Sequence, residues 1–387
     1  MARPLLWLSV THPGRRHAGN QVYTGGLLDA LGAAGQQVTL LTQDDGPPIA
    51  GVTVERVALP RLRHRVLGIA SRLPASAWQL GHPAMARRLQ ALLGKRDWGA
   101  VVIDQAACGW ALDAVRRSAC PLVYIAHNQE GDVRAEVAER EASPFRRAIM
   151  QRDAAKYGRL ECDLVHCASL ITAITAADAR AFSRKAGTAG VLELTPGYSG
   201  PRVEARTLSK DTPRRVVLVG RFEWVAKQQN LSRWAAEAVP LLAANAIETQ
   251  VIGTVPPALR EELQRPYLRF AGRVDELGPH LANARFGLVA EDVGGGFKLK
   301  TLDYIFHRLP VAALADNLVG QPMGVIANTL VAETPAALAG EIVSAIDNLE
   351  RLNRMQQNTF IAASSSFDWM LRAQQFLTAL DSLDRHE

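Results

Sequence analysis

Two stretches in the second half of the chain place cations and glycines directly after apolar, strand-like runs. In the first, Val216–Leu231, Arg221 follows the apolar run and Lys227 lies where a helix is expected to start. Cations at a helix N-terminus form an anion site, because the unpaired N–H groups and the positive end of the helix dipole add to the side-chain charges. Opposite unit charges about 4 Å apart attract by about 4 kcal/mol at an effective dielectric of about 20, so two such cations favour a diphosphate. The alternative is structural pairing of these cations with Glu223 or Asp292.

The second stretch, Glu291–Val311, contains three consecutive glycines near its start, Gly294, Gly295 and Gly296. Glycines let a backbone approach a phosphate or a sugar ring closely, and this run lies between an apolar strand and a helix predicted from about Phe297. This stretch therefore also predicts an anion site. The alternative is an ordinary loop.

Two charged residues follow the glycines on that predicted helix. Lys300 lies one turn nearer the glycines than Asp303, which we place about two turns into the helix. There its carboxylate can accept hydrogen bonds from ribose hydroxyls, or it is a solvated helix carboxylate.

Motifs for several other chemistries are absent from the sequence. There is no D-x-D, H-E-x-x-H, G-x-S-x-G or P-loop motif, and no G-x-G-x-x-G follows the first strand. Without a carboxylate pair to grip a divalent cation on a sugar diphosphate, we expect neither a metal nor a bound cofactor. Cys162, His166 and Cys167 have ligand types but lack a second ligand pair, and we interpret them as buried thiols beside a surface histidine.

Strand-sized apolar runs alternate with helix-length segments along the whole chain, which is typical of parallel α/β sheets. The strands predicted in the first half are Leu5–Val10, Gln37–Thr42, Val52–Leu59, Ala100–Ile103, Leu122–Ala126, Leu170–Thr175 and Val191–Leu194. Those predicted in the second half are Arg215–Gly220, Glu248–Ile252, Leu268–Ala271, Phe286–Ala290 and Val311–Leu314. The sequence therefore predicts an α/β fold with two doubly wound sheets.

A stretch rich in Pro, Gly and Ser, Thr195–Arg202, divides the two series of strands. We predict a Rossmann-like domain over 1–197, a second over 198–366, and a final segment over 367–387 whose helix, Trp369–Leu383, returns to the first domain. Doubly wound sheets bind ligands at the carboxyl ends of their strands, so we expect the domains to face a common cleft.

Composition excludes several classes of protein. The chain has 387 residues, 48% of them hydrophobic and 21% charged, as in an ordinary globular protein. No apolar run approaches the roughly 18 to 20 residues of a membrane-spanning helix. Four cysteines without a repeating spacing do not form a disulfide framework and predict a reducing, cytoplasmic location.

The basic excess of the chain lies in its first half. Residues 1–197 contain 24 Lys and Arg against 17 Asp and Glu, whereas residues 198–387 contain 20 against 21. Between residues 61 and 96 the arginines alternate with leucine and tryptophan, a pattern that fits peripheral contact with anionic lipid at the inner face of a membrane, or with a phosphate-bearing acceptor. A solvated helix surface is the alternative. No zinc-finger spacing or basic arm indicates a nucleic acid partner.

The motifs of the second half resemble a known family. Val-Gly-Arg-x5-Lys-x2-Asn-Leu, followed some 65 residues later by Gly-Gly-Gly-Phe-x2-Lys-x2-Asp-x6-Pro-Val, looks like the donor-binding half of the retaining group 1, or family-four, glycosyltransferases of the GT-B fold. Weaker similarities extend over the chain, at residues 12–26, 173–182, 272–275 and 366–369.

This resemblance implies a role for each matching position. Arg221 and Lys227 would hold the diphosphate of a nucleotide sugar, and Asp303 would bind its ribose. Arg273 and Val274 would flank the base. The phosphates and sugar would face a glycine loop and its neighbours, namely Gly294, Gly295, Gly296, Phe297, Lys298 and Lys300.

One position departs from the pattern of that family, which often has two glutamates eight positions apart. The second corresponds to Asp303, and the first falls on Gly295. The acid that usually contacts the donor sugar is therefore missing, and Glu291 or Asp292 is a candidate to replace it.

The resemblance also selects residues in the first half. Gly25 and Gly26 would begin a helix near the donor phosphates or the acceptor, and His127, at the end of a strand, would lie beside the reacting anomeric carbon. The alternative for His127 is a satisfied loop histidine. Further candidates include the acceptor contacts His17, Asp104 and Glu130; Asp104, Glu130 or Asp132 would be the general base if the enzyme inverts.

The leading hypothesis is a metal-independent glycosyltransferase that moves a sugar from a nucleotide diphosphate sugar to an acceptor hydroxyl, in the synthesis of a polysaccharide, a lipid-linked saccharide or a natural-product glycoside. The missing first acid motivates a second hypothesis, an inactive partner protein of the same fold that binds a nucleotide sugar or stabilises an active enzyme. A phosphorylase or a nucleotide-sugar epimerase is a third.

Overall fold

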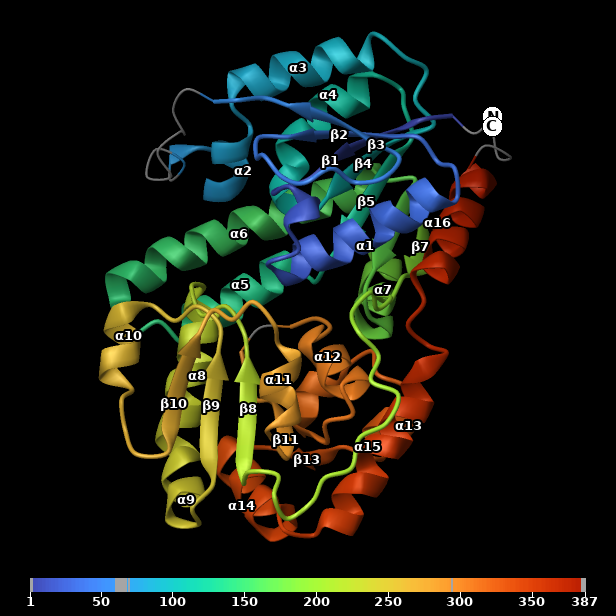
Figure 1. The fold of residues 1–387 in the computed structure, drawn as a ribbon. Coiled ribbons are helices and arrows are strands. Elements are labelled where there is room, and N and C mark those ends of the chain that lie inside the picture. Colours follow the sequence, from blue (N-terminus) through green and yellow to red (C-terminus); the bar gives the residue numbers. More distant parts are fainter. Residues whose placement is uncertain (1–2, 60–67, 69, 294, 384–387) are drawn as a thin grey trace. The chain divides into compact units, whose positions relative to one another are not determined.

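The computed structural model describes residues 3–59, 68, 70–293 and 295–383. The chain forms two compact units, Met1–Gly197 with Asp368–Glu387, and Tyr198–Phe367 (Figure 1). Each unit is built around one parallel sheet with helices packed against it.

The sheet of the first unit has seven parallel strands in the order β3-β2-β1-β4-β5-β6-β7. Its strands are β1 (Leu5–Leu8), β2 (Val38–Thr42), β3 (Val52–Arg56), β4 (Ala100–Asp104), β5 (Leu122–Ala126), β6 (Leu170–Ala173) and β7 (Gly190–Glu193). The predicted strands of this half are confirmed, to within a few residues at their ends. The central strands β1, β4 and β5 are buried along their whole length, because helices cover both faces of a parallel sheet.

Helices connect these strands. They are η1 (Pro13–Arg15), α1 (Gly19–Ala33), α2 (Ala75–Leu80), α3 (Pro83–Leu93), η3 (Ala106–Ala111), α4 (Leu112–Arg117), α5 (Glu130–Glu139), α6 (Pro144–Cys167) and α7 (Ala176–Ser183). Helix α6 starts with proline at its first position and with Ser143 as N-cap, which are two ordinary signals for a helix start.

The prediction that Gly25 and Gly26 begin a helix is wrong, since both lie inside α1, which starts at Gly19. A Cβ atom at Gly25 would lie 2.2 Å from the Arg16 guanidinium, and one at Gly26 would lie 2.2 Å from the Trp369 ring. These glycines therefore provide room for two large side chains that pack against α1.

The C-terminal helix α16 (Trp369–Leu383) packs against α1, which confirms the predicted return of the chain to the first unit. The Trp7 and Phe376 rings lie 6.1 Å apart, and the Arg372 Nε donates to the Thr195 carbonyl at 2.9 Å. Apolar packing and a side-chain hydrogen bond together attach this helix.

The sheet of the second unit has six parallel strands in the order β10-β9-β8-β11-β12-β13. Its strands are β8 (Arg215–Val219), β9 (Glu248–Ile252), β10 (Leu268–Gly272), β11 (Phe286–Val289), β12 (Val311–Leu314) and β13 (Leu330–Ala332). The edge strand β13 was not predicted, because three residues are too few to show a strand pattern.

The helices of the second unit include the one predicted from about Phe297, which in fact begins at Lys300, so Asp303 lies in its first turn. Residues 297–299 form the approach to that helix, where the Lys298 Nζ donates back to the Gly295 carbonyl at 3.0 Å. The full set is α8 (Val225–Glu237), α9 (Val239–Ala244), α10 (Pro257–Glu262), α11 (Gly278–Ala282), α12 (Lys300–Phe306), η4 (Ala315–Leu318), α13 (Met323–Ile326), α14 (Pro335–Ala345) and α15 (Leu349–Ser364).

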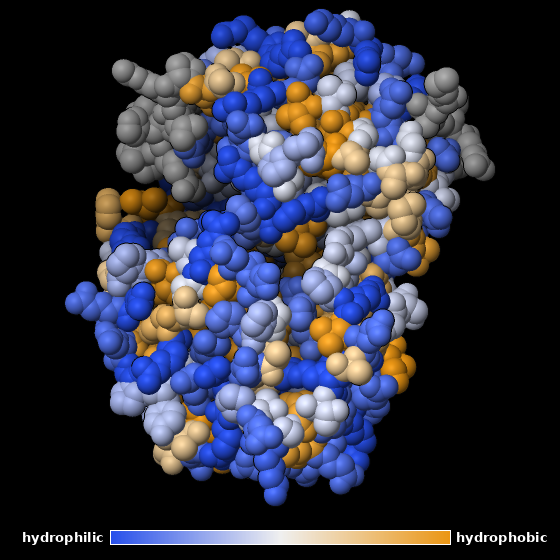
Figure 2. All heavy atoms as spheres, viewed as in Figure 1, coloured by the Kyte–Doolittle hydropathy of each residue, from blue (hydrophilic) through white to orange (hydrophobic). Residues whose placement is uncertain are grey.

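The visible surface is mostly hydrophilic, with hydrophobic residues in small separate groups (Figure 2). Among the described residues, no helix combines the length and the apolar character needed to cross a membrane. Part of the arginine-rich stretch of the first half, residues 60–67 and 69, lies outside the described residues.

Candidate functional site

In both sheets the strand order reverses next to the first strand of the unit, at β1 and β4 in the first unit and at β8 and β11 in the second. Ligands of doubly wound sheets bind at the carboxyl ends of the strands at such a reversal. Arg221 follows β8, Glu291 follows β11, and Asp104 is the last residue of β4. Several residues selected from the sequence therefore lie at these two positions.

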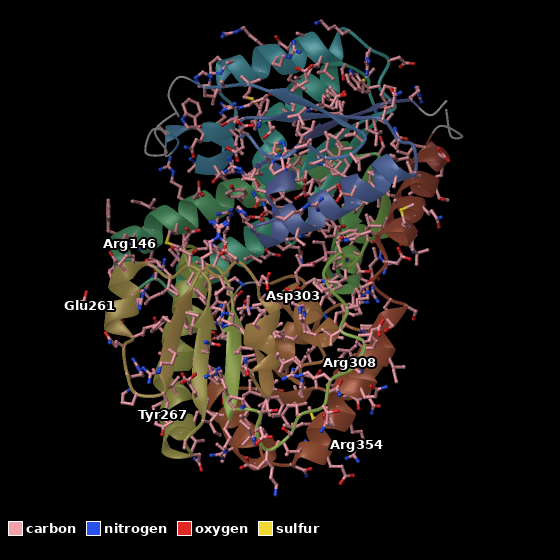
Figure 3. All side chains as sticks on the ribbon, in the orientation of Figure 1. Arg146, Glu261, Tyr267, Asp303, Arg308 and Arg354 are labelled. Atoms are coloured by element: carbon pink, nitrogen blue, oxygen red, sulfur yellow. The ribbon has the colours of Figure 1, made fainter. Side chains whose placement is uncertain are left out.

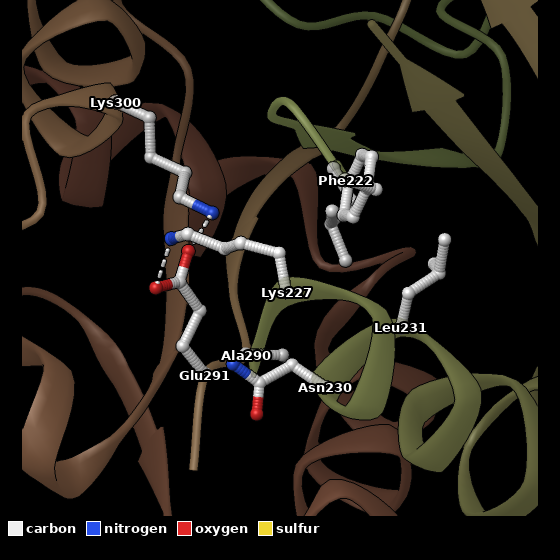
Figure 4. Close-up of a pocket in the computed structure, with 8 residues that line it drawn as sticks. Phe222, Lys227, Asn230, Leu231, Ala290, Glu291 and Lys300 are labelled. Carbon is white, nitrogen blue, oxygen red and sulfur yellow. Dashed lines mark hydrogen bonds and ion pairs between the residues drawn. The ribbon is translucent and has the colours of Figure 1, made fainter. Parts of the chain in front are cut away.

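A group of four charges lies at the reversal in the second unit, where three lysines surround Glu291. The Glu291 carboxylate pairs with the Lys300 Nζ at 2.5 Å, with the Lys298 Nζ at 3.3 Å and, through a shorter contact, with the Lys227 Nζ. The Glu291 side chain is only 4% exposed, and those of Lys227 and Lys300 are 26% and 11% exposed. Figure 4 shows two of these ammonium groups converging on the carboxylate.

These charged groups shift one another's pKa values. Burial alone would raise the pKa of Glu291, but the adjacent ammonium groups of Lys227, Lys300 and Lys298 hold it well below its usual range. Burial lowers the pKa of Lys300 to about 8, with Lys227 and Lys298 also lowering it and Glu291 opposing the shift. Lysine outnumbers carboxylate in this group, which makes it suited to an anion.

Two asparagines position the loop that carries Glu291. The Asn317 side-chain amide accepts from the Glu291 N–H at 2.8 Å and donates to the Glu291 carbonyl at 2.5 Å. Asn230, on α8, makes the same pair of bonds with the Val293 backbone, at 3.0 and 2.8 Å. Asn230 belongs to the motif around Arg221 and Lys227, but the sequence did not indicate that it holds the loop backbone. No pattern in the sequence near Asn317 indicated the same role for that residue.

The remaining charges near the start of α8 form pairs of their own. The Arg221 guanidinium is half-exposed and donates to Glu223 at 2.5 Å, which is the pairing considered as the alternative for this residue. Asp292 pairs with Arg233, and not with Lys227. Of the two acids considered as replacements for the missing one, Glu291 is therefore the one that contacts the lysines.

The glycine loop lies next to this group. Gly294 is outside the described residues. Gly295 is exposed, and Gly296 has a φ of 79°, which a residue with a side chain rarely adopts. The Phe297 ring packs edge-on against Phe367 at 5.7 Å, so this residue anchors the loop to the apolar core.

Asp303 lies half-buried on α12 (Figure 3). Burial raises the pKa of its carboxyl to about 6, while a hydrogen bond from the Tyr198 hydroxyl at 3.2 Å opposes the shift. Tyr198 stacks on Phe306 at 4.5 Å and was not selected from the sequence, since it lies 105 residues away from Asp303 in the chain.

The two residues assigned to the base follow β10. Arg273 is exposed, whereas Val274 is partly buried and packs against an apolar core of the second unit. Gly272, with a φ of 73°, turns the chain directly before them.

In the first unit, His127 and Asp104 form a hydrogen-bonded pair. The His127 Nε2 lies 2.8 Å from the Asp104 Oδ1, and the other oxygen of Asp104 accepts from the Thr24 hydroxyl at 2.7 Å and from the Trp7 indole at 3.3 Å. The Tyr23 ring packs edge-on against the imidazole at 5.0 Å. Asp104 is thus buried, protein groups form hydrogen bonds with both of its oxygens, and its carboxylate orients the His127 ring.

Glu130 and His17 are more peripheral. The Glu130 carboxylate pairs with Arg134 one turn further along α5, at 2.9 Å. His17 is exposed, and its backbone N–H donates to the Gln21 Oε1 at the start of α1. Within the described residues, neither side chain forms a hydrogen bond or an ion pair with His127 or Asp104.

No group of three or more His, Cys, Asp or Glu residues within the described ranges is arranged to hold a metal ion. Cys162 is exposed on α6, with its sulfur 3.4 Å from the His166 Nδ1, so the expectation of a buried thiol is wrong at this residue. A long helix, unlike a loop, places residues four apart on the same surface.

Comparison with known proteins supports an assignment for both halves of the chain. Residues 18–198 match the glycosyl transferase 4-like domain, and residues 213–348 match the family of glycosyl transferases group 1. No curated protein sequence matches the chain.

Solved structures with a similar fold span nearly the whole chain. HepE from Anabaena, solved in complex with UDP, is 16% identical, with a TM-score of 0.65 over 98% of this chain and 100% of that one. WaaG, a glycosyltransferase involved in lipopolysaccharide biosynthesis, is 16% identical, with a TM-score of 0.68 over 98% of this chain and 99% of that one. A trehalose-phosphate synthase from Burkholderia vietnamiensis is 14% identical, with a TM-score of 0.67 over the full length of both chains.

These likenesses identify the fold as GT-B, as the motifs predicted. The order of the strands in both sheets and the return of α16 to the first unit agree with that assignment. By its matches in both halves, the chain belongs to the group 1 glycosyltransferases.

Proposed function

We propose that this enzyme transfers a sugar, without a metal ion and with retention of configuration, from a nucleotide diphosphate sugar to an acceptor hydroxyl. The observation that carries the proposal is the group of lysines around Glu291, at the strand reversal of the second sheet. In this proposal the second unit holds the donor, and the first unit holds the acceptor.

The diphosphate is the leaving group of the reaction. The bond between its oxygen and the anomeric carbon breaks, the acceptor oxygen bonds to that carbon on the same face, and the acceptor proton passes to the departing oxygen. Lys227, Lys298 and Lys300 stabilise the negative charge that develops on the diphosphate. Arg221 joins them when it exchanges Glu223 for the ligand.

The other donor contacts follow the same assignment. Asp303 accepts from the ribose hydroxyls, Arg273 and Val274 flank the base, and the backbone of Gly295 and Gly296 faces the phosphates and the sugar. His127, oriented by Asp104, holds a sugar hydroxyl or polarises the acceptor.

We further propose an acceptor that is lipid-linked or bears a phosphate, with peripheral contact of the first unit at an anionic membrane. The basic excess of residues 1–197 supports this. At the start of α6, Phe145 is 76% exposed and lies next to Arg146 and Arg147 in the chain, which combines an apolar side chain with cations. Sedimentation with anionic and with neutral vesicles tests this contact. We expect the protein to bind to the anionic vesicles only.

Calorimetric titration with UDP, GDP, TDP and ADP, with and without EDTA, tests the donor site. We expect one nucleotide to bind with micromolar affinity, independently of EDTA, and binding to be lost in Arg221→Ala and Lys227→Ala. A product assay with the matching sugar nucleotides should then yield a glycoside and free nucleotide diphosphate.

The second candidate function is an inactive partner protein that binds a nucleotide sugar. It is favoured by the absence of the first acid, at Gly295, and by the engagement of Arg221 with Glu223. Nucleotide binding without a glycoside product would support it, and a changed free sugar nucleotide would indicate an epimerase.

A further inference from the structure

We propose that Glu291 competes with the donor diphosphate for Lys227 and Lys300, and so limits the affinity of this enzyme for its donor. The inference rests on the proposed function, because it concerns the same group of lysines. In this inference Glu291 acts as an internal anion, which means that its carboxylate occupies the lysines that would otherwise bind the diphosphate. It does not replace the missing acid that contacts the sugar.

The pairing of the two lysines is the first argument. Among the described residues, Glu291 is the carboxylate within ion-pair distance of both Lys227 and Lys300. The two ammonium groups contact different oxygens of this one carboxylate, so a single side chain occupies both cations. A diphosphate, which presents several oxygens to the same cations, must share them with Glu291 or displace it.

The fixed backbone of Glu291 is the second argument. Asn317 holds both the N–H and the carbonyl of this residue. The carboxylate can therefore withdraw from the lysines by rotation of its own side chain, while the loop keeps its position. Asp292, the next residue, forms an ion pair with Arg233, whereas Glu291 forms one with Lys227.

The surroundings of the carboxylate are the third argument. Apolar side chains also line this small pocket, namely Leu218, Phe222, Leu231 and Ala290. Figure 4 shows Phe222 and Leu231 on the side away from Lys300. Water screens the charges poorly in such a place, so the attraction between carboxylate and ammonium is strong and opposes the binding of a second anion. The removal of the carboxylate charge should therefore favour the diphosphate.

The experiment compares Glu291→Gln with the wild type by calorimetric titration with inorganic pyrophosphate and with the preferred nucleotide diphosphate, at about pH 6. Glu291 opposes the lowering of the Lys300 pKa, so this low pH keeps Lys300 charged when the carboxylate is removed. Asp292→Asn is the matched control, because it removes the same charge from the neighbouring residue. We expect Glu291→Gln to bind both ligands with a Kd at least about tenfold lower, and Asp292→Asn to change the Kd less than about twofold. An unchanged or higher Kd in Glu291→Gln overturns the inference, since Glu291 would then hold the lysines in place for the ligand.

A second variant keeps the test valid if Glu291→Gln does not fold. Glu291→Asp retains the charge but moves it back by one methylene group, which weakens its contact with the lysines. Its Kd for pyrophosphate should fall between those of the wild type and Glu291→Gln. A Kd equal to or above the wild-type value contradicts the inference.

The two ligands separate this inference from the proposed function. Tighter pyrophosphate binding in Glu291→Gln, with no nucleotide diphosphate bound by any variant, supports the internal anion and overturns the donor site. Nucleotide diphosphate binding of equal strength in the wild type and Glu291→Gln supports the donor site and overturns the internal anion.

Discussion

The His127 Nε2 lies 2.8 Å from the Asp104 Oδ1, where β4 and β5 end in the first sheet. An ionised carboxylate only accepts hydrogen bonds, so Asp104 directs the Nε2 proton toward itself and leaves the Nδ1 as the ring nitrogen that can accept one. Thr24 and Trp7 donate to the other oxygen of Asp104, which fixes the carboxylate in turn.

The first prediction concerns this pair. Asp104→Asn should lower kcat by about tenfold or more, because the amide can no longer select one tautomer and orientation of His127. The KM for the donor should change little. In a His127→Ala background the same substitution should have almost no further effect on kcat, and additive losses would show that Asp104 acts independently of His127.

The second prediction concerns the cations of the donor site. Lys227→Ala should reduce turnover at least about tenfold, because the loss of one preorganised cation costs on the order of 2 to 4 kcal/mol of transition-state stabilisation. Arg233→Ala removes a cation of the same helix that pairs with Asp292 and Glu237 and should keep most of the activity. Steady-state kinetics of both variants tests this, and near wild-type turnover in Lys227→Ala would contradict the placement of the diphosphate.

The third prediction is a pH dependence of donor binding. Burial lowers the pKa of Lys300 to about 8, so this lysine is charged below about pH 8 and neutral above it. The affinity for the nucleotide diphosphate should therefore fall as the pH rises from 7 to 9.5, and binding above pH 8 should take up a proton. Titration in buffers with different ionisation enthalpies measures this uptake.

Lys300→Arg is the control for that prediction, because arginine stays charged over the whole range. Its affinity for the diphosphate should depend less on pH than that of the wild type. An identical pH dependence in the two proteins would assign the titration to another group.

The fourth prediction concerns the attachment of the C-terminal helix. Gly26→Ala would place a Cβ atom 2.2 Å from the Trp369 ring, and overpacking of this kind costs about 1 to 3 kcal/mol. Thermal unfolding should show a lower Tm for this variant. In Gly158→Ala, a change inside α6, the new Cβ atom meets no atom within 4 Å, so the Tm should remain equal or rise.

The sequence alone was sufficient to predict the two series of strands and the helix Trp369–Leu383. Parallel strands are buried on both faces and read as continuous apolar runs, so local patterns identify them. The edge strand β13 was missed because three residues show too little of a strand pattern. Gly25 and Gly26 were misplaced because these positions require glycine to make room for the Arg16 and Trp369 side chains, which the local sequence does not reveal.

The candidate site was predictable where its residues lie next to strand ends. Arg221, Lys227 and the glycine loop follow apolar strands, and local sequence is enough to select them. Glu291 was only one of two possible acids, since the choice depends on which side chain points to the lysines.

Long-range partners depended on the tertiary structure. Asn317 holds Glu291 across 26 residues, Asp104 meets His127 across 23, and Tyr198 meets Asp303 across 105. Sequence patterns report the burial and conformation of a segment, which depend on neighbouring residues. Hydrogen bonds and ion pairs depend on the packing of distant segments, and so only the folded chain decided which charge faces which.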